Sequence, residues 1–447
     1  MPLLQRKVTG ENKMANRKPQ SKEEKDLLQK AQRYLPGAHL GNASSSFEDS
    51  FIVKNGKGSK VFDYSGNEYI DYLLGSGPMI LGHAHPSVIE AVSRQLAEGS
   101  TFFLTNGTVI QLAEEICNAV ACADMVRFTT SGTDATFQCI RAARAYRKRD
   151  KVLKFEGGFH GSHDYALQSV TPSNLVDFPQ PVPGSAGIPK AVQDTVLVAP
   201  FNDLEVTSEI IAEHHNELAA VIVEPMQRII PPVPGFLQGL RLLTEKYEIP
   251  LIFDEVVTGF RFAYGGAQEY YNVIPDLASI GKIVGGGYPL AAICGRADIM
   301  QAYDSTVVET TDFIPQIGTL NGNPIAAAAG LATLAELRKP GTYERLRTVG
   351  ELLRNTLQDT LDQAEIPAKV TGENSVFDVY FTDQEITTYR STLGANTALM
   401  QKFNRFLLEG GLLKGGQKFY VSLAHTDEDI EKTIQLIKDA TKELTRV

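Results

Sequence analysis

The sequence predicts an α/β protein with a largely parallel central sheet in a large domain and a second, smaller α+β domain. From about residue 85 to residue 335, short apolar runs alternate with helical stretches. This alternation is typical of a parallel sheet that helices cover on both faces. After about residue 340, a long helix, further strands and a last helix predict the smaller unit.

Three segments of the chain are expected to build these two domains. A chain of 447 residues is long enough for both. We predict that residues 1–70 form an N-terminal segment of the small domain, that residues 71–335 form the large domain, and that residues 336–447 complete the small domain. The small domain would therefore combine the two ends of the chain.

The N-terminal segment is expected to hold one helix and a small β-meander. The run SKEEKDLLQKAQRYL has amphipathic spacing, and Ser21 is its expected N-cap. A loop rich in Gly, Ser and Asn follows in PGAHLGNASSSF. The meander is expected in FIVKNGKGSKVFDYSGNEYIDYL, with turn signals at Asn55-Gly56 and Ser65-Gly66.

The strands and helices of the larger unit are expected at defined runs. The predicted strands are MVRFTT, KVLKF, TVLVAP, AAVIVEP, LIFDEV and AAICG. The predicted helices include DATFQCIRAARAYRKR, FLQGLRLLTEKY and NPIAAAAGLATLAELRK. Two further helices are expected in the small domain, in YERLRTVGELLRNTLQDTLDQA and DEDIEKTIQLIKDATKEL.

Composition argues against several classes of partner. The formal net charge is -10 and no basic stripe is present, so nucleic acid is not expected. No apolar run reaches the roughly 20 residues of a membrane span, and the polar N-terminus lacks the apolar core of a secretion signal. The cytoplasm is the expected location. The cysteines show no metal-binding spacing and are expected as reduced thiols, although their even number permits disulfides; they are Cys117, Cys122, Cys139 and Cys294.

A single lysine stands out in the stretch ASIGKIVGGGYPLA. Lys282 ends an apolar run and precedes three glycines. One interpretation is a lysine at a strand end whose charge reaches water. The other is an amine whose pKa is lowered by burial, so that it attacks a carbonyl group. Ligands of open α/β sheets bind beyond the carboxyl ends of the strands, so the residues after the other runs decide between the two.

A phosphate site is predicted after the run MVRF. The residues Ser131, Gly132 and Thr133 begin a predicted helix, whose free N–H groups and dipole favour an anion. The alternative is ordinary helix capping, by Thr133 or Asp134.

Aromatic and acidic residues follow three other runs. Phe159 and His160 lie among glycines, where the ring of Phe159 either stacks on a flat ligand or belongs to the core. Glu224 and Gln227 follow AAVIV. Asp254 ends LIFDE and needs a cationic partner, which is a protonated pyridine nitrogen or an arginine such as Arg261 in a structural ion pair.

Taken together, these strand ends match one cofactor. Pyridoxal 5′-phosphate needs an anion site, a stacking face, a carboxylate for its ring nitrogen and a Schiff-base amine. Ser131 to Thr133, Phe159, Asp254 and Lys282 would supply them in that order along the chain.

The chain resembles the class III aminotransferases of fold type I, and within them the glutamate-1-semialdehyde 2,1-aminomutase group. The similar segments are GSGPMILGHAHP, VRFTTSGTDAT, DKVLKFEGGFHGSHD, AAVIVEP, PPVPGFLQGLR, LIFDEVVTGFR, GGAQEYY, GKIVGGGYPLAA and GTLNGNPIAAAAGLATL. They cover about residues 60–335, with a weaker similarity at VSLAHTDEDIE.

The resemblance implies roles for individual residues. Lys282 matches the Schiff-base lysine, and Asp254 matches the carboxylate on the pyridine nitrogen. Val256 matches the apolar residue under the ring. Further matches are Phe159 as the stacking aromatic with His160 beside it, Ser131, Gly132 and Thr133 as the phosphate loop, and Glu224 and Gln227 near the cofactor. Thr319 matches a threonine that reaches the phosphate in the neighbouring subunit, so the resemblance implies a homodimer with shared active sites.

The departures from the aminomutase group concern the substrate. The group carries an N-terminal loop arginine that holds the substrate carboxylate, but PGAHLGNASSSF contains no arginine. Gln417 replaces a glutamate of the substrate pocket, and Ser76 stands where a tryptophan is frequent. Arg228 directly follows Gln227, and it is either a carboxylate clamp from a new direction or a surface arginine.

These departures favour an aminotransferase that moves an amino group from an amino acid or amine donor to a separate carbonyl acceptor. One alternative is a true aminomutase that produces 5-aminolevulinate. Another is an amino-acid racemase on the same scaffold. A non-catalytic cofactor carrier is disfavoured by the complete set of cofactor residues, and a nicotinamide dehydrogenase by the lack of a GxGxxG between strand and helix.

Overall fold

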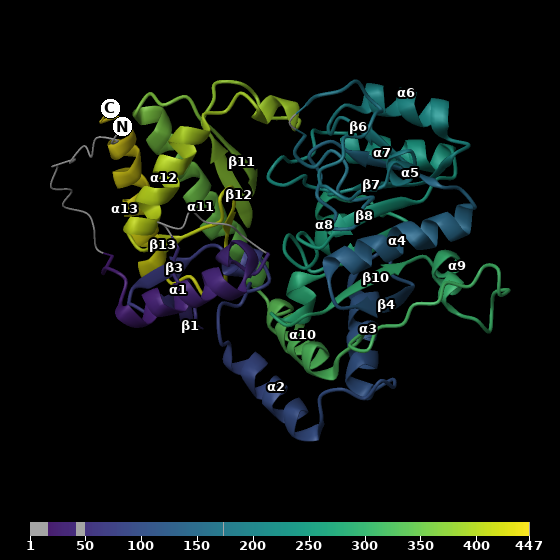
Figure 1. The fold of residues 1–447 in the computed structure, drawn as a ribbon, viewed down its shortest axis with the longest axis horizontal. Coiled ribbons are helices and arrows are strands. Elements are labelled where there is room, and N and C mark those ends of the chain that lie inside the picture. The colour runs from purple at the N-terminus through teal and green to yellow at the C-terminus, as the bar shows by residue number, and fades with distance from the viewer. Residues whose placement is uncertain (1–16, 42–49, 173, 447) are drawn as a thin grey trace.

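The computed structural model describes residues 17–41, 50–172 and 174–446. Two parts lie side by side (Figure 1). The larger part holds a seven-stranded sheet, which α4 (Gly132–Arg147) and α7 (Phe236–Lys246) flank. The smaller part holds two short sheets and the helices α11 (Thr342–Gln363) and α13 (Asp427–Leu444).

The seven-stranded sheet is parallel except for one strand. β10 runs antiparallel to both of its neighbours, and the other strand pairs are parallel. The six predicted runs are all strands, and the sheet contains one more that was not predicted, formed by LASI. In sheet order the strands are β4 (Met125–Thr129), β10 (Ala291–Gly295), β9 (Leu277–Ile280), β8 (Leu251–Glu255), β7 (Leu218–Val223), β5 (Lys151–Phe155) and β6 (Val196–Ala199).

Both faces of this sheet are buried, as the apolar runs predict. In β8, Ile252 packs into a cluster with α4, and Leu251 and Phe253 pack into a cluster with α6 (Leu204–His214) and α7. Successive strand residues point to opposite faces, so each face needs its own helical cover. This is why the strands read as continuous apolar runs.

A third cluster covers the β9–β10 side of the sheet and continues into the small domain. Its centre is α10 (Pro324–Leu337), the alanine-rich helix, which packs against α2 (Pro86–Glu98) and α3 (Gly107–Ala119). The small side chains of α10 allow this close helix packing. The three helices lie together below the sheet in Figure 1.

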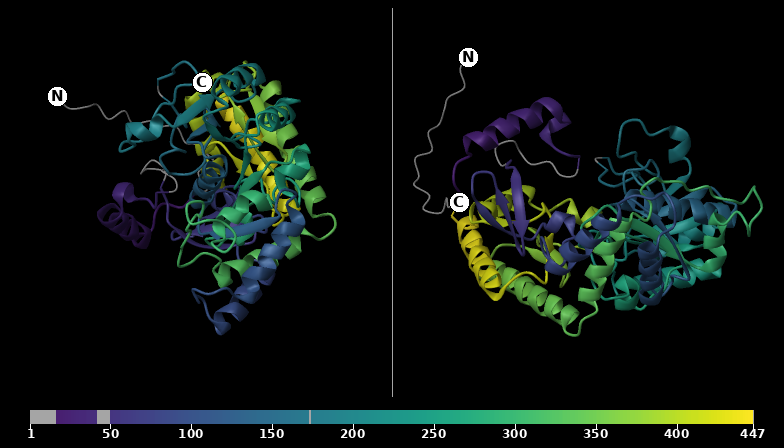
Figure 2. Two further views of the ribbon diagram at one scale, coloured as in Figure 1. Left: turned by 90° about the vertical axis from the view of Figure 1, so that its right-hand side faces the viewer. Right: turned by 90° about the horizontal axis from the view of Figure 1, so that it is seen from below.

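The two ends of the chain share one sheet in the small domain. β13 pairs in parallel with β3, and Leu412 lies opposite Ile70. The purple and yellow segments are therefore neighbours in Figure 1, and Figure 2 places α1 (Lys22–Tyr34) at the periphery. This confirms a small domain made of both ends, while the exact boundaries stay predictions. One sheet is β1 (Val53–Lys57), β2 (Lys60–Asp63), β3 (Glu68–Asp71) and β13 (Leu412–Leu413), and the other is β11 (Lys369–Glu373), β12 (Val376–Tyr380) and β14 (Phe419–Tyr420).

The predicted helices are present, and one predicted turn is wrong. Ser21 caps α1 by accepting a hydrogen bond from Glu24 N at 3.2 Å. The β1–β2 turn lies at Gly58-Ser59 because Asn55-Gly56 is part of β1, next to an irregularity in its register. The remaining helices are α5 (Lys190–Gln193), α8 (Gly266–Tyr271), α9 (Ala297–Met300) and α12 (Thr397–Glu409), with short 3₁₀ turns at Pro36–Ala38, Leu74–Ser76, Lys282–Gly285, Gln301–Tyr303 and Arg390–Thr392.

Two further expectations concern helix character and thiols. Among the described residues, no helix combines the length and apolar character that a bilayer crossing requires. The four cysteines all lie in the described ranges, and each is unpaired.

A buried lysine anchors the segment that follows β5. Lys154 is 1% exposed, and its Nζ donates hydrogen bonds to the carbonyl oxygens of Gly158 at 3.0 Å and Ala166 at 2.9 Å, and also to that of Gln168. Three carbonyl acceptors match the three N–H donors of a protonated lysine. The segment from residue 158 to residue 168 is thereby held against the sheet.

We expect Lys154→Met to destabilise the protein. The substitution leaves three carbonyl oxygens without a donor, so the free energy of unfolding should fall by about 2 kcal/mol or more. Urea denaturation measures this loss, and hydrogen exchange should increase in residues 158–168.

The matched control is Lys151→Met in the same strand. Lys151 forms an ion pair with Glu217 at 2.8 Å in which both side chains are partly exposed. Such pairs contribute about 1 kcal/mol or less. Equal stability of the two variants would contradict the anchoring role of Lys154.

Candidate active site

A cleft of about 990 Å³ opens at the carboxyl ends of the strands. Most of the residues singled out in the sequence line it, although they come from separate strand ends. Its far wall comes from the small domain, through the turn at Gly415–Lys418 and Tyr420 of β14. The predicted residues that line the cleft are Ser76, Ser131, Gly132, Thr133, Phe159, His160, Glu224, Arg228, Asp254, Val256, Lys282 and Gln417.

The N-terminus of α4 forms one end of the cleft. Ser131 is the N-cap, and its hydroxyl accepts a hydrogen bond from Asp134 N at 3.2 Å, so neither Thr133 nor Asp134 is the cap. The first N–H groups of a helix have no partner within the helix. A Cβ on Gly132 would lie 2.8 Å from Val256 Cγ1. Glycine therefore lets α4 begin directly against Val256, with free N–H groups at the cleft.

The segment after β5 places an aromatic ring in the cleft. Phe159 is 40% exposed there, and its backbone N–H donates to Glu224 Oε2 at 3.0 Å. Gly161 has φ +100°, and a Cβ there would lie 2.6 Å from the Cα of Thr133. Glycine at this position lets the segment pass close to the start of α4, which brings Phe159 next to the anion site.

Asp254 is a buried carboxylate at the end of β8. Its Oδ2 lies 2.8 Å from His160 Nδ1, and its Oδ1 accepts hydrogen bonds from Val256 N at 3.1 Å and the Ser279 hydroxyl at 3.2 Å. The Nε2 atom of His160 is buried and has no hydrogen-bond partner among the described residues. Asp254 lines the cleft in this fixed orientation.

Arg261 is not the partner of Asp254. It is 1% exposed and donates to the carbonyl oxygens of Gly77 and, at 3.2 Å, Val421. Its guanidinium lies over the Tyr420 ring, 5.1 Å from the centroid. The sequence alternative of an Asp254–Arg261 ion pair is therefore wrong.

Lys282 follows β9 and projects into the cleft from a left-handed backbone conformation, with φ +52°. That conformation costs a non-glycine residue about 1 kcal/mol or more. Burial lowers the pKa of Lys282, and the charge of Lys418 lowers it further, against the opposing effects of Tyr420, Asp254 and Glu224. More of this amine is therefore neutral at pH 7 than of an ordinary lysine.

Lys418 and Tyr420 belong to the site although the sequence analysis did not single them out. Burial raises the pKa of Tyr420, but the charges of Lys418, Lys282 and Arg261 outweigh burial, and the net pKa is lowered. Both residues come from the C-terminal part of the chain, beside Gln417. Their proximity to Gln417 was the signal that could have found them.

Two predicted residues lie elsewhere. Gln227 is 1% exposed, and its Nε2 donates to Glu156 O at 2.8 Å. It therefore contacts the backbone of the segment after β5 and does not line the cleft. Thr319 lines a separate hollow with Phe102 and Leu104. Of the loop Pro36–Phe47, residues 42–47 lie outside the described residues.

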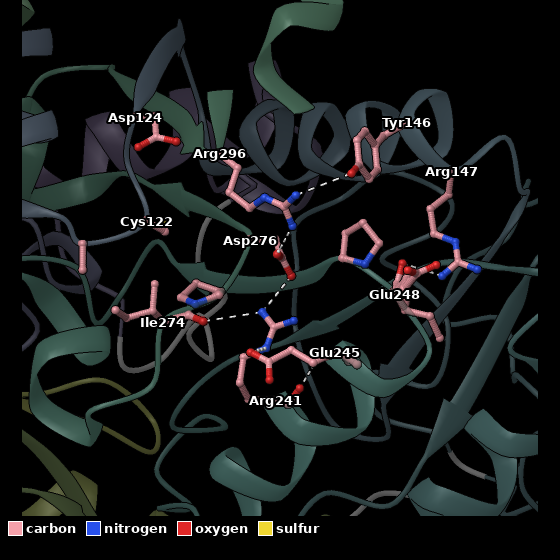
Figure 3. A pocket seen from close by; sticks show the side chains of 15 residues that line it. Cys122, Asp124, Tyr146, Arg147, Arg241, Glu245, Glu248, Ile274, Asp276 and Arg296 are labelled. Carbon is pink, nitrogen blue, oxygen red and sulfur yellow. Dashed lines mark hydrogen bonds and ion pairs between the residues drawn. The ribbon is translucent and has the colours of Figure 1, made fainter. Parts of the chain in front are cut away.

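A second large hollow lies at the opposite, amino-terminal edge of the sheet (Figure 3). Arg241 and Arg296 approach the two carboxylate oxygens of Asp276, each at 2.7 Å. Arg147 donates to the carbonyl oxygens of Tyr247 and Glu248 at 2.7 and 2.6 Å. Because the charges of Asp276, Arg241 and Arg296 satisfy one another, this hollow holds a structural ion network.

Comparisons with known proteins agree with this geometry. The family model for aminotransferase class-III matches residues 43–441. The chain is 41% identical over 426 residues to a glutamate-1-semialdehyde 2,1-aminomutase from Methanococcus maripaludis. The alignment covers 94% of this chain and 98% of that relative.

Solved structures give the same result. An omega-transaminase from Sphaerobacter thermophilus has a TM-score of 0.89 at 35% identity. The superposition covers 94% of this chain and 97% of the transaminase chain. A transaminase with PLP bound has a TM-score of 0.86 at 28% identity, with the same coverage. These findings confirm the predicted family, the fold type and the pyridoxal-phosphate cofactor. The chain belongs to the class-III aminotransferases.

Proposed function

We propose that the protein transfers an amino group from an amino acid or amine donor to a separate carbonyl acceptor. The observation that carries this proposal is the convergence of Lys282, Asp254, Phe159 and the start of α4 on one cleft. These residues come from four different strand ends. The reaction that we propose has small-molecule substrates and takes place in the cytoplasm.

The residues of the cleft fit pyridoxal 5′-phosphate. An exposed ring at Phe159, free N–H groups at Gly132 and Thr133, and the buried carboxylate of Asp254 provide a stacking face, an anion site and a partner for the ring nitrogen. When bound, this cofactor supplies an electron sink for the pair of electrons left on the substrate carbon.

The residues of the chain have distinct tasks in this proposal. Lys282 would hold the cofactor through Nζ, and once the substrate amine takes its place the freed Nζ would accept the proton of the substrate carbon and deliver it to the cofactor. Its lowered pKa favours the neutral amine that this task requires. Asp254 stays oriented by its three hydrogen-bond partners, and Val256 supports the ring from the apolar side.

We further propose a homodimer with shared active sites. Thr319 does not line the cleft of its own chain, which agrees with a role at the phosphate of a partner. Apolar side chains near it are exposed, including Phe103 at 67%, Leu104 at 79% and Ile317 at 84%. A second copy of the chain would cover this apolar surface.

A glutamate-1-semialdehyde 2,1-aminomutase is the second candidate, and the 41% identity to a protein of that name favours it. Against it stand the lack of an arginine in Pro36–Phe47 and the presence of Gln417 in the cleft. The intramolecular reaction needs no external acceptor, so the two candidates can be separated by experiment.

The purified protein should give a stoichiometric change in cofactor absorbance with a single amino donor and no acceptor. We would compare α-amino acids, β-amino acids, ω-amines and glutamate-1-semialdehyde. A change with one donor class, reversed by a carbonyl acceptor, is the expected result. A response only to the semialdehyde, with 5-aminolevulinate formed and no acceptor needed, would establish the second candidate.

Lys282→Ala should abolish the absorbance of lysine-bound cofactor and lower turnover at least about 100-fold, because the amine that holds the cofactor and moves the proton is lost. Spectroscopy of the purified variant tests this. The control is Lys190→Ala, an exposed lysine outside the cleft. Persistence of the lysine-bound absorbance would refute the assignment.

Asp254→Asn should retain part of the cofactor affinity and lower kcat by about 10²–10³-fold, because a neutral amide does not keep the ring nitrogen protonated. Steady-state kinetics and cofactor titration measure the two effects separately. Ser279→Ala, which removes one hydrogen bond to Asp254 at 3.2 Å, should have a smaller effect of the same kind. Turnover of Asp254→Asn near that of the unmodified protein would exclude the role of Asp254.

A further inference from the structure

Besides Lys282, two cations in the cleft have no anionic partner among the described residues. Arg228 and Lys418 both line it and are half-buried, yet neither forms an ion pair or side-chain hydrogen bond with any described residue. Their contacts are aromatic: Arg228 Cζ lies 5.6 Å from the centroid of the Phe159 ring, and Lys418 Nζ lies 5.9 Å from that of Tyr420. No described residue accepts a hydrogen bond from either side chain, so both are available to a ligand in the cleft.

Apart from the reacting amine Lys282, two other cations on neighbouring segments are paired. Lys414 pairs with Asp378 at 2.7 Å, and Arg390 binds Glu156 through two hydrogen bonds of 2.8 and 3.0 Å. A chain with a net charge of -10 has ample carboxylates for such pairs. Within the part of the chain that the structure describes, the lack of partners at Arg228 and Lys418 therefore goes with their position in the cleft.

The backbone fixes Arg228 on one wall. Arg228 has φ +62°, within a tight turn closed by Gln227 N to Ile230 O at 3.0 Å and Ile230 N to Gln227 O at 2.8 Å. Gln227 is itself bound to Glu156 O. The left-handed backbone conformation and the two hydrogen bonds of the turn fix the position from which the Arg228 side chain extends.

Lys418 belongs to the opposite wall. Its carbonyl oxygen accepts from Gly415 N at 3.2 Å, in the turn that leads into β14. Its charge lowers the pKa of Lys282, so Lys418 lies within electrostatic range of the reacting amine. One cation comes from the large domain and the other from the small domain, and each has its own aromatic support.

We propose that Arg228 and Lys418 bind the two carboxylates of an amino dicarboxylate substrate. The planar guanidinium matches a carboxylate with two parallel hydrogen bonds, and the lysine provides a second point charge. Cations on separate walls suit two anionic groups on one molecule better than a single one. This inference rests on the proposed amino transfer and names its substrate class.

The test uses ligands without an amine, so that binding is separate from chemistry. Calorimetric titration of the holoenzyme compares glutarate, a dicarboxylate, with butyrate, a monocarboxylate. Glutarate should bind about tenfold tighter or more, and Arg228→Gln or Lys418→Gln should each weaken glutarate binding about 10–100-fold. The charge-retaining variants Arg228→Lys and Lys418→Arg should recover part of it.

The chain offers a matched control for each cation. Arg141 lies over the Phe137 ring at 4.4 Å, and Lys246 lies over the Tyr247 ring at 5.0 Å, both outside the cleft. Arg141→Gln and Lys246→Gln should leave glutarate binding within about twofold of the unmodified protein. If these control variants lost as much glutarate affinity, the effect would come from the overall charge of the protein and not from the cleft.

Equal affinity for glutarate and butyrate would overturn the proposal, as would normal glutarate binding in both glutamine variants. A second readout is the ratio of half-reaction rates with amino dicarboxylates and amino monocarboxylates, which should fall in each variant. If no donor changes the cofactor absorbance while glutarate binding follows the prediction, amino transfer is refuted and the dicarboxylate site stands. If the half-reactions proceed normally but show no preference for dicarboxylates, only the dicarboxylate inference is refuted.

Discussion

A carboxylate buried at the end of a central strand needs hydrogen-bond donors on several sides, because taking a charge out of water is costly. Asp254 obtains them from its own strand end through Val256 N, from β9 through Ser279 and from the segment after β5 through His160. These hydrogen bonds fix three chain segments relative to the Asp254 carboxylate. The position of the proposed ring-nitrogen partner is set by the same contacts that join these strand ends.

The rest of the cleft follows from this arrangement. His160 reaches Asp254 because its segment is anchored by Lys154, and Gly161 lets that segment pass against Thr133 at the start of α4. The start of α4 in turn lies on Val256 through Gly132. The anion site, the aromatic ring and the buried carboxylate are therefore mutually positioned, and a shift in one would move the others.

The sequence revealed the parts of this site that are coded locally. Strand ends could be read from apolar runs, and Lys282 and Asp254 from polar residues that end such runs. Lys418 and Tyr420 of the far wall were missed because they come close to Lys282 only through the packing of the two domains. Gln227 has the expected sequence neighbours, but its side chain turns to Glu156, a contact that no local pattern encodes.

The two edges of the large sheet show what distinguishes a binding cleft from a structural hollow. Both contain arginines and carboxylates at strand ends. At the amino-terminal edge, Asp276 binds two arginines and the charges satisfy one another. At the carboxyl edge, no described residue pairs with Arg228 or Lys418, and none bonds to the buried Nε2 of His160. The charge of an anionic ligand that enters this cleft therefore meets cations that no described carboxylate already neutralises, whereas at the other edge the same ligand would have to compete with Asp276.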